Sequence, residues 1–409
     1  MPFRKDLQYY KFCFYGFLKN LRFFDAFFIL FLKHKGLSYT EIGSLYAIRE
    51  ILTNLSEIPT GIIADTYGRK HSLSLSFVVY IISFLLFYTG NSYWIFFIAF
   101  ILYGIADAFR SGTHKGMIMR YLQIKLWEDE KINYYGHTRA CSQRGSAVSA
   151  LIAGFIVFYS GNYQSIFLLS VVPYMINLFL ILSYPSALNQ TEQKQKNTLL
   201  NKLKDLWTAI KSPEVLSIIH SAAIFTAYQK AVKDYIQPVM KNVALIFPLW
   251  IGLQSEKRSG ILIGIMYFIL FLLTAQASVW SNKISRINNI SIKSLLFGFA
   301  GGIAGGYFFH IHWWLLSLIA FSFIYIVESL RKPILTAYLA DEVSNDILTS
   351  VLSAQSLYRS LMTAVLSIAF GFLADISGLG RALFIISILL IIITLVADKK
   401  SKFTGRQPL

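Results

Sequence analysis

The sequence predicts an all-α membrane protein with twelve transmembrane helices in two six-helix halves. Composition is the first observation behind this prediction: of 409 residues, 55% are hydrophobic and only 14% are charged. Soluble proteins carry about 25% charged residues, so this chain lacks the polar surface that a water-exposed globule needs. The second observation is that the apolar residues gather in runs of about 20, the length that spans a bilayer.

The apolar runs fall into two groups of six, separated by one longer polar stretch. The predicted spans of the first half cover residues 12–32, 41–64, 72–90, 93–117, 139–160 and 164–184. Those of the second half cover residues 214–237, 260–280, 291–309, 313–335, 347–370 and 381–397. We therefore expect an N-terminal six-helix bundle over residues 1–185, a cytoplasmic linker over 186–213 and a C-terminal six-helix bundle over 214–409.

The linker is predicted to contain an amphipathic helix that lies at the membrane surface. The apolar residues that recur there at helical spacing are Leu199, Leu203, Leu206 and Ile210. Three lysines occupy other faces of such a helix, namely Lys202, Lys204 and Lys211. A flexible linker is the alternative interpretation of this stretch.

The net charge of +17 is interpreted as membrane topology and not as nucleic-acid binding. With the N-terminus placed in the cytoplasm, most loop lysines and arginines lie on the cytoplasmic side. The opposite side holds Lys33, Lys35, Lys241, Lys257, Arg258 and Arg381. The positive-inside rule then predicts that both termini are cytoplasmic. We expect a multi-pass protein of the cytoplasmic (inner) membrane, a monomer in contact with lipids.

Charged residues inside the predicted spans are the most informative feature for function. The cations are Lys19, Arg22, Arg49, Arg110, Lys115, Arg144, Lys230, Lys233 and Arg359. The acids are fewer and comprise Asp25, Glu50, Glu57, Asp107, Asp234 and Glu328. Each charge near the bilayer centre costs about 2.5–3.5 kcal/mol, so we expect these side chains to face protein or a water-filled cavity. The excess of cations favours an anionic substrate, a coupled proton, or both.

The candidate site follows from these charges. The predicted substrate-binding residues are Arg22, Arg49, Arg110, Lys230, Lys233 and Arg359. The predicted proton-coupling residues are Asp25, Glu50, Asp107 and Glu328. The alternative for any single residue is a structural salt bridge between helices. We expect no catalytic residue, no metal and no cofactor.

Residues 57–70, EIPTGIIADTYGRK, resemble the signature of the major facilitator superfamily between its second and third helices. The matching residues are Gly61, Asp65, Gly68, Arg69 and Lys70. Thr66 departs from the pattern, because the family usually has a basic residue there. The resemblance implies the twelve-helix fold of that family and transport by alternating access, with substrate bound between the two halves.

The resemblance also implies a role for the signature. Close helix packing at Gly61 would bring Asp65 to a helix end of the other half, where its charge meets the helix dipole. Arg69 and Lys70 would complete this cytoplasmic latch of the outward-open state. A second segment, FRSGTHKGMIMRYL (109–122), is also similar to the family, but it carries His114 and Lys115 where many relatives have an acid.

A weak internal repeat is consistent with two related halves. The chain reads GFIVFYSG at 154–161 and GFLADISG at 371–378. An arginine precedes each copy, Arg144 before the first and Arg359 before the second.

The predicted function is a secondary active transporter that moves a small anionic solute and is coupled to protons. Two alternatives within transport are broad efflux of drugs or lipophiles and a lipid flippase. An alternative from a different class is an intramembrane enzyme that uses the histidines near the membrane faces, His114, His137, His310 and His312. The sequence contains neither HExxH nor GxSxG, and we expect no enzyme activity.

The asymmetry of basic residues predicts which loops an impermeant thiol reagent reaches from outside intact cells. Single cysteines at positions 195 and 402 should be protected, whereas one at position 255 should be labelled. Labelling at position 195 from the outside would contradict the predicted topology.

Overall fold

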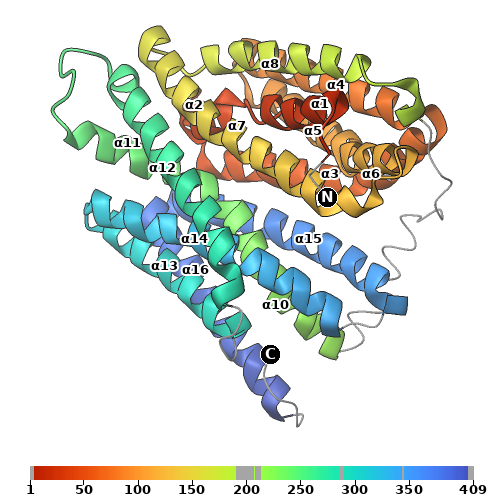
Figure 1. Cartoon of the computed structure of the whole chain (residues 1–409). Coiled ribbons are helices and arrows are strands. Elements are labelled where there is room, and N and C mark those ends of the chain that lie inside the picture. The colour runs from red at the N-terminus through yellow and green to blue at the C-terminus, as the bar shows by residue number, and fades with distance from the viewer. Residues whose placement is uncertain (1–3, 190–206, 208–212, 285–289, 343–344, 404–409) are drawn as a thin grey trace. The chain divides into compact units, whose positions relative to one another are not determined.

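The computed structural model describes the chain except for residues 1–3, 190–206, 208–212, 285–289, 343–344 and 404–409 (Figure 1). The described part consists of helices and connections and contains no strand. The predicted surface helix of the linker, from Leu199 to Lys211, falls almost wholly outside the described residues.

The elements follow the predicted spans closely at most positions. In the first half they are α1 (Leu7–Leu18), η1 (Phe23–Ala26), α2 (Phe28–His34), α3 (Tyr39–Tyr67), α4 (Arg69–Thr89), α5 (Tyr93–Arg110), α6 (Thr113–Ile124), η2 (Glu128–Glu130), α7 (Lys131–Ser160), α8 (Ser165–Leu182) and η3 (Ser186–Asn189). In the second half they are α10 (Pro213–Val232), η4 (Lys233–Tyr235), α11 (Ile236–Ile246), α12 (Ser255–Ile284), α13 (Ile290–His310), α14 (Trp314–Glu342), α15 (Asn345–Ser377) and α16 (Leu379–Phe403).

Nine helical segments among the described residues are long and apolar enough to cross a membrane. The predicted spans outside these nine are 12–32, 41–64 and 214–237. The first and the last are interrupted, and the middle one, α3, is continuous but carries five charged residues. The all-α membrane fold is thus confirmed. The three remaining spans differ from the nine because their backbone is irregular or because they carry several charged residues.

The first span is not the continuous helix that the apolar run 12–32 predicts. Helix α1 ends at Leu18, and regular structure resumes only at the short helix η1. Asn20 supplies a local reason, because its side-chain amide donates to the carbonyl of Gly16 at 2.9 Å. Such side-chain bonds satisfy carbonyls at a helix end and compete with continuation of the helix.

Side chains of helix α8 form hydrogen bonds with backbone groups that this break leaves without helical partners. The Tyr174 hydroxyl donates to the carbonyl of Lys19 at 3.0 Å, and Ser170 Oγ accepts from the backbone N–H of Phe23 at 3.1 Å. Ser170 and Tyr174 are buried and lie one helical turn apart. Unsatisfied backbone groups are costly at membrane depth, so α8 is part of what makes the break possible.

A comparable break lies in the first span of the second half. The 3₁₀ turn η4 separates α10 from α11, and the Tyr325 hydroxyl on α14 donates to the carbonyl of Lys233 at 2.9 Å. The seventh predicted span therefore also differs from a continuous helix. Both halves thus begin with an interrupted helix that a tyrosine from another helix supports.

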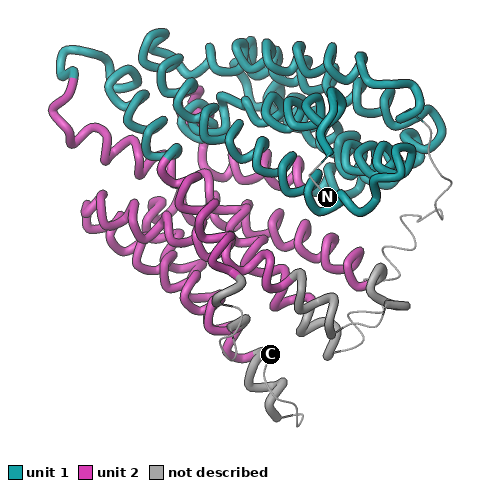
Figure 2. Tube along the Cα trace, in the orientation of Figure 1, with its two compact units in different colours: residues 1–31, 51–197, 250–268 teal, residues 32–50, 198–249, 269–409 magenta. Residues whose placement is uncertain are grey.

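The chain divides into two compact units, each drawn in its own colour in Figure 2. Unit 1 comprises residues 1–31, 51–197 and 250–268, and unit 2 comprises residues 32–50, 198–249 and 269–409. Helices α2, α3 and α12 are each divided between the units, and each unit contains segments from both predicted halves. The bundle boundaries 1–185, 186–213 and 214–409 stay a prediction.

Glycines bring α7 and α12 into close contact inside unit 1. A Cβ atom added to Gly264 would lie 2.7 Å from the carbonyl oxygen of Ala150, and one added to Gly154 would lie 2.8 Å from the carbonyl oxygen of Gly260. Small residues at such spacings let helix backbones approach each other in membranes. No side chain larger than hydrogen fits at these two positions without movement of a helix.

The α7–α12 contact predicts opposite effects for two glycine replacements. Gly264→Ala should lower the unfolding temperature of the purified protein, because the new Cβ meets backbone. Gly136→Ala on α7 should leave the unfolding temperature unchanged or raise it, because its Cβ would meet no described atom within 4 Å and alanine is the better helix former. Equal unfolding temperatures for both variants in a thermal melt would show that the contact is not tight.

Candidate functional site

The break between α1 and η1 holds an ion pair of unit 1. Arg22 Nη2 lies 3.0 Å from Asp25 Oδ2, and Arg22 Nη1 donates to the Tyr103 hydroxyl at 2.6 Å. The side chains of Arg22 and Asp25 retain 27% and 44% of their exposure. The predicted substrate residue Arg22 and the predicted proton carrier Asp25 are therefore partners of each other.

Helix α5 carries a second ion pair in the same unit. Arg110 Nη2 lies 2.8 Å from Asp107 Oδ1, and Arg110 Nε donates to the Tyr80 hydroxyl at 2.9 Å. The Tyr80 hydroxyl in turn donates to Asp107. Tyr80, which the sequence did not single out, thus joins both charges of this pair.

Lys19 differs from these cations because it forms no ion pair with a described carboxylate. Its ammonium lies 5.7 Å from the centre of the Tyr15 ring, which stacks on His114 at 3.7 Å. Arg22, Asp107 and Arg110 all lie close enough to interact with it electrostatically. The five charges of this unit, which we name the unit 1 charge cluster, are Lys19, Arg22, Asp25, Asp107 and Arg110. Three cations and two acids leave the cluster with an excess positive charge.

Unit 2 holds a corresponding cluster around the break between α10 and α11. Lys230 Nζ lies 2.6 Å from Glu50 Oε1, and Lys233 Nζ lies 2.6 Å from Asp234 Oδ1. Glu50 stands 180 positions before its partner in the sequence. We name Glu50, Lys230, Lys233, Asp234 and Arg359 the unit 2 charge cluster.

Arg359 on α15 is the cation of the unit 2 charge cluster that has no described carboxylate as a partner. Its Nη2 donates to Ser356 Oγ at 3.2 Å, and its Nε is buried without a hydrogen-bond partner among the described residues. Lys230 and Arg359 lie close enough to interact electrostatically. Arg49, the remaining predicted substrate residue, places its guanidinium 4.8 Å from the centre of the Tyr46 ring.

Glu328 on α14 is the predicted proton carrier whose surroundings differ from those of the others. Its Oε1 accepts from Thr226 Oγ1 at 2.8 Å, whereas its Oε2 is buried and has no hydrogen-bond partner in the described part of the chain. The residue is 9% exposed. Arg331, one turn further on, is 1% exposed and donates to Ser294 Oγ and to the carbonyl of Ser221.

The two clusters are related by spacing in the sequence. The pairs Lys19 with Arg22 and Lys230 with Lys233 sit three residues apart at the break of each half's first helix. The pairs Asp107 with Arg110 and Glu328 with Arg331 have the same spacing on each half's fourth helix. This repeat would have added Lys19 to the candidate site.

Three residues of the family-like signature make contacts inside unit 1. Gly68 caps α4 at a φ of +94°, which favours glycine. The Arg69 guanidinium covers Gly116, where an added Cβ would lie 2.7 Å from Nη1. Lys70 Nζ donates to the carbonyl of Tyr184 at 2.8 Å. These contacts fix the loop between α3 and α4 to α6 and to the end of α8.

The other two signature residues, Gly61 and Asp65, lie on a more open part of α3. A Cβ added to Gly61 would meet no atom of the described residues within 4 Å, and Asp65 is exposed. The latch role that the family resemblance implies for them stays a prediction.

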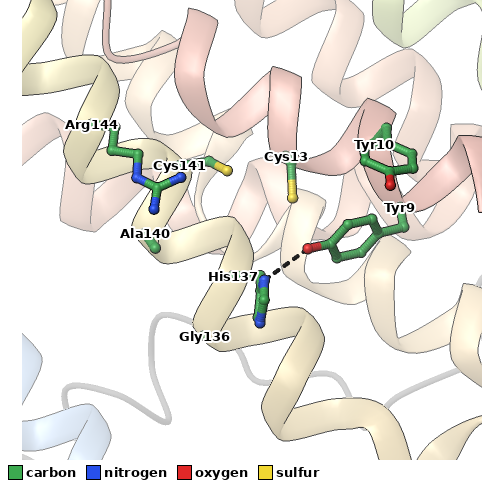
Figure 3. Close-up of a pocket in the computed structure, with 8 residues that line it drawn as sticks. All are labelled: Tyr9, Tyr10, Cys13, Gly136, His137, Ala140, Cys141 and Arg144. Atoms are coloured by element: carbon green, nitrogen blue, oxygen red, sulfur yellow. Dashed lines mark hydrogen bonds between the residues drawn. The ribbon is translucent and has the colours of Figure 1, made fainter. Parts of the chain in front are cut away.

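A pocket of about 490 Å³ lies between α1 and α7, apart from the predicted site residues (Figure 3). Its lining includes His137, whose Nδ1 pairs with the Tyr9 hydroxyl at 2.8 Å, and both cysteines of the chain, Cys13 and Cys141. The cysteines form no disulfide. Among the described residues, no group of three or more His, Cys, Asp or Glu side chains could hold a metal ion.

Comparisons with known proteins agree with this geometry. The family model of the Major Facilitator Superfamily matches residues 13–365. "Uncharacterized MFS-type transporter YxaM" of Bacillus subtilis (strain 168) is 23% identical over 377 residues, which cover 90% of this chain and 89% of the relative. A "Na(+), Li(+), K(+)/H(+) antiporter" of Planococcus maritimus is 23% identical over 282 residues, which cover 64% of this chain and 65% of the relative.

Solved structures share the fold at low sequence identity. The nucleoside transporter NupG has a TM-score of 0.69 at 13% identity, and the match covers 96% of this chain and 97% of that one. A POT family transporter in complex with 5-aminolevulinic acid has a TM-score of 0.72 at 13% identity, and the match covers 99% of each chain. Since the family model spans most of the sequence, the chain belongs to the Major Facilitator Superfamily and is a multi-pass membrane transporter of small molecules.

Proposed function

We propose that this transporter moves a small anionic solute across the cytoplasmic membrane by alternating access, coupled to protons. One observation carries the proposal: the first helix of each half is broken, and cations stand at both breaks. Lys19 and Arg22 lie at the α1 break, and Lys230 and Lys233 lie at the η4 turn. Interrupted helices at corresponding positions of two repeats mark substrate sites in transporters.

The proposed roles of the cations differ according to their partners. Arg22, Arg110, Lys230 and Lys233 are held by carboxylates, so their charge is largely compensated. Lys19 and Arg359 form no such pair with a described residue. A cation without an ion-pair partner attracts an anion strongly in surroundings of low dielectric, and we assign the first contact with the solute to Lys19 and Arg359.

Glu328 is the proposed proton carrier. Asp25, Glu50 and Asp107 already compensate a cation each, whereas Glu328 is hydrogen bonded only through Oε1 in the described structure. A buried carboxylate oxygen without a partner is costly, and a bound proton removes that cost. Glu328 therefore can gain and lose a proton without breaking an ion pair.

A second candidate function is exchange of a metal cation for protons, which the printed name of the Planococcus maritimus relative favours. The positive excess in both charge clusters opposes it, and it opposes efflux of cationic drugs for the same reason. A lipid flippase acting on anionic headgroups shares the charge argument. For an intramembrane enzyme, one of the four candidate histidines, His137, pairs with the Tyr9 hydroxyl in a pocket apart from the charge clusters.

The assignment of Lys19 and Arg359 predicts selective loss of anion binding. The parent protein in detergent should be stabilised by at least one compound from a panel of carboxylates and organic phosphates, since a ligand bound to the native state raises the unfolding temperature. Lys19→Met and Arg359→Met should each lower the affinity for that compound about tenfold or more, as expected for loss of a charged contact.

Lys115→Gln is the matched control, because Lys115 is an exposed cation that lies over the Tyr135 ring. Its affinity should equal that of the parent. Stabilisation of the parent by cations alone, or unchanged anion affinity in both methionine variants, would contradict the proposal.

Neutralising Glu328 should uncouple transport from protons. In proteoliposomes, Glu328→Gln should exchange solute across the membrane but should no longer concentrate it when a pH gradient is imposed, because the side chain cannot release a proton. Glu128→Gln removes an exposed carboxylate on η2 and should concentrate solute like the parent. Gradient-driven accumulation by Glu328→Gln would exclude this residue as the proton carrier.

A further inference from the structure

The first part of the family-like signature, without its Arg–Lys pair, occurs twice in the chain. Residues 61–68 read GIIADTYG, and residues 371–378 read GFLADISG. Glycine, alanine, aspartate and glycine recur at the same spacing, and the positions between the first glycine and the alanine are apolar in both copies. The first copy ends α3 and the second ends α15, which the resemblance to the family did not reveal.

The aspartate of the second copy binds the beginning of α3. Asp375 Oδ1 accepts from the backbone N–H of Tyr39 at 2.8 Å, and Oδ2 accepts from the backbone N–H of Thr40 at 2.7 Å. The Thr40 hydroxyl donates to Oδ2 at 2.6 Å. A helix N-terminus offers unpaired N–H groups and the positive end of the helix dipole. The negative charge of the Asp375 carboxylate is therefore stabilised there.

Glycines of both helices make this approach possible within unit 2. A Cβ added to Gly371 would lie 2.2 Å from the carbonyl oxygen of Tyr39, and one added to Gly43 would lie 2.3 Å from the carbonyl oxygen of Ser367. Each glycine thus lies directly against the backbone of the opposite helix. The two contacts are four residues apart on each helix. Helices α3 and α15 are therefore held together by close backbone packing as well as by the hydrogen bonds of the Asp375 carboxylate.

The two copies of the motif act at opposite ends of one helix. Helix α3 has 29 residues, or about 43 Å at 1.5 Å per residue, which matches a full bilayer with its interfaces. Asp375 binds its first residues, and Gly61 and Asp65 lie in its last turns. The contact at the first end is therefore the one that Asp375 makes with the backbone of Tyr39 and Thr40.

The Asp375 contact is suited to being broken and remade. Asp375 is exposed to solvent, so water can replace its hydrogen bonds. Helix α3 also has a cap of its own, because Ser38 Oγ accepts from the N–H of Glu41 at 3.1 Å and Glu41 Oε2 accepts from the N–H of Ser38 at 2.7 Å. This capping box keeps the helix start formed when Asp375 departs.

We propose that Asp375 is a positioning residue that holds α3 against α15 and closes the outer end of the transport path. It is the outer counterpart of the signature around Asp65. The inference rests on the proposed alternating access and on the predicted topology, and it does not depend on which solute is carried.

The test measures opening of the α3–α15 contact with no solute present. In a chain with Cys13→Ser and Cys141→Ser, Ser367→Cys places one thiol at the contact, where Ser367 is 1% exposed. The rate of its reaction with a membrane-impermeant maleimide applied from outside reports the open outer end. Asp375→Ala should raise this rate about five- to tenfold, as expected for loss of charged capping bonds.

Ser377→Ala is the matched control, because Ser377 lies two residues away at the same helix end and its hydroxyl binds only the carbonyl of Leu373 among the described residues. It should label like the parent. Asp375→Asn keeps one acceptor oxygen and should give an intermediate rate, and it replaces Asp375→Ala if that variant does not fold.

Parental labelling rates in both Asp375→Ala and Asp375→Asn would overturn the inference. The outcome is separate from that of the proposed function: failure of every anion to bind would refute the anionic solute and leave the labelling result intact. Conversely, anion binding with unchanged labelling would refute only the latch at Asp375.

Discussion

The structure depends on one constraint, which is that a charge or an open backbone group at membrane depth must find a partner other than lipid. Four ion pairs, Arg22–Asp25, Asp107–Arg110, Lys230–Glu50 and Lys233–Asp234, meet it for side chains. Hydroxyl groups on α8 and α14 meet it for the broken backbone. The irregular segments exist only because neighbouring helices supply these partners, and the same segments bring cations together.

The two halves solve this problem with similar groups. A tyrosine hydroxyl binds the carbonyl of Lys19 in one half and of Lys233 in the other. An acid precedes an arginine by three residues on both fourth helices. Yet the partners diverge: Arg110 binds its neighbour Asp107, whereas Arg331 donates to Ser294 and Ser221. This divergence leaves Thr226 as the hydrogen-bond partner of Glu328 in the described part of the chain.

The sequence predicted what depends on composition and local spacing, and it did not predict what depends on contacts between distant segments. Apolar runs located the helices, and i, i+3 spacing placed Arg110 beside Asp107. The Lys230–Glu50 pair joins residues 180 positions apart, so spacing carries no signal for it. The break after Leu18 was hidden because the run 12–32 is apolar enough to span, while Asn20 and Tyr174 act through hydrogen bonds that hydropathy does not record.

Helix α8 shows how side chains that bind the backbone of another helix limit the substitutions that such a protein tolerates. By hydropathy it is a plain lipid-facing wall, and its Ser170 and Tyr174 look replaceable by phenylalanine or leucine. Either exchange would make the helix more apolar and would leave every topology signal intact. It would also strand a backbone group of the first helix in hydrocarbon. Sequence drift in this family member is thus restricted at positions that neither charge nor a sequence motif would mark, because their partner is main chain.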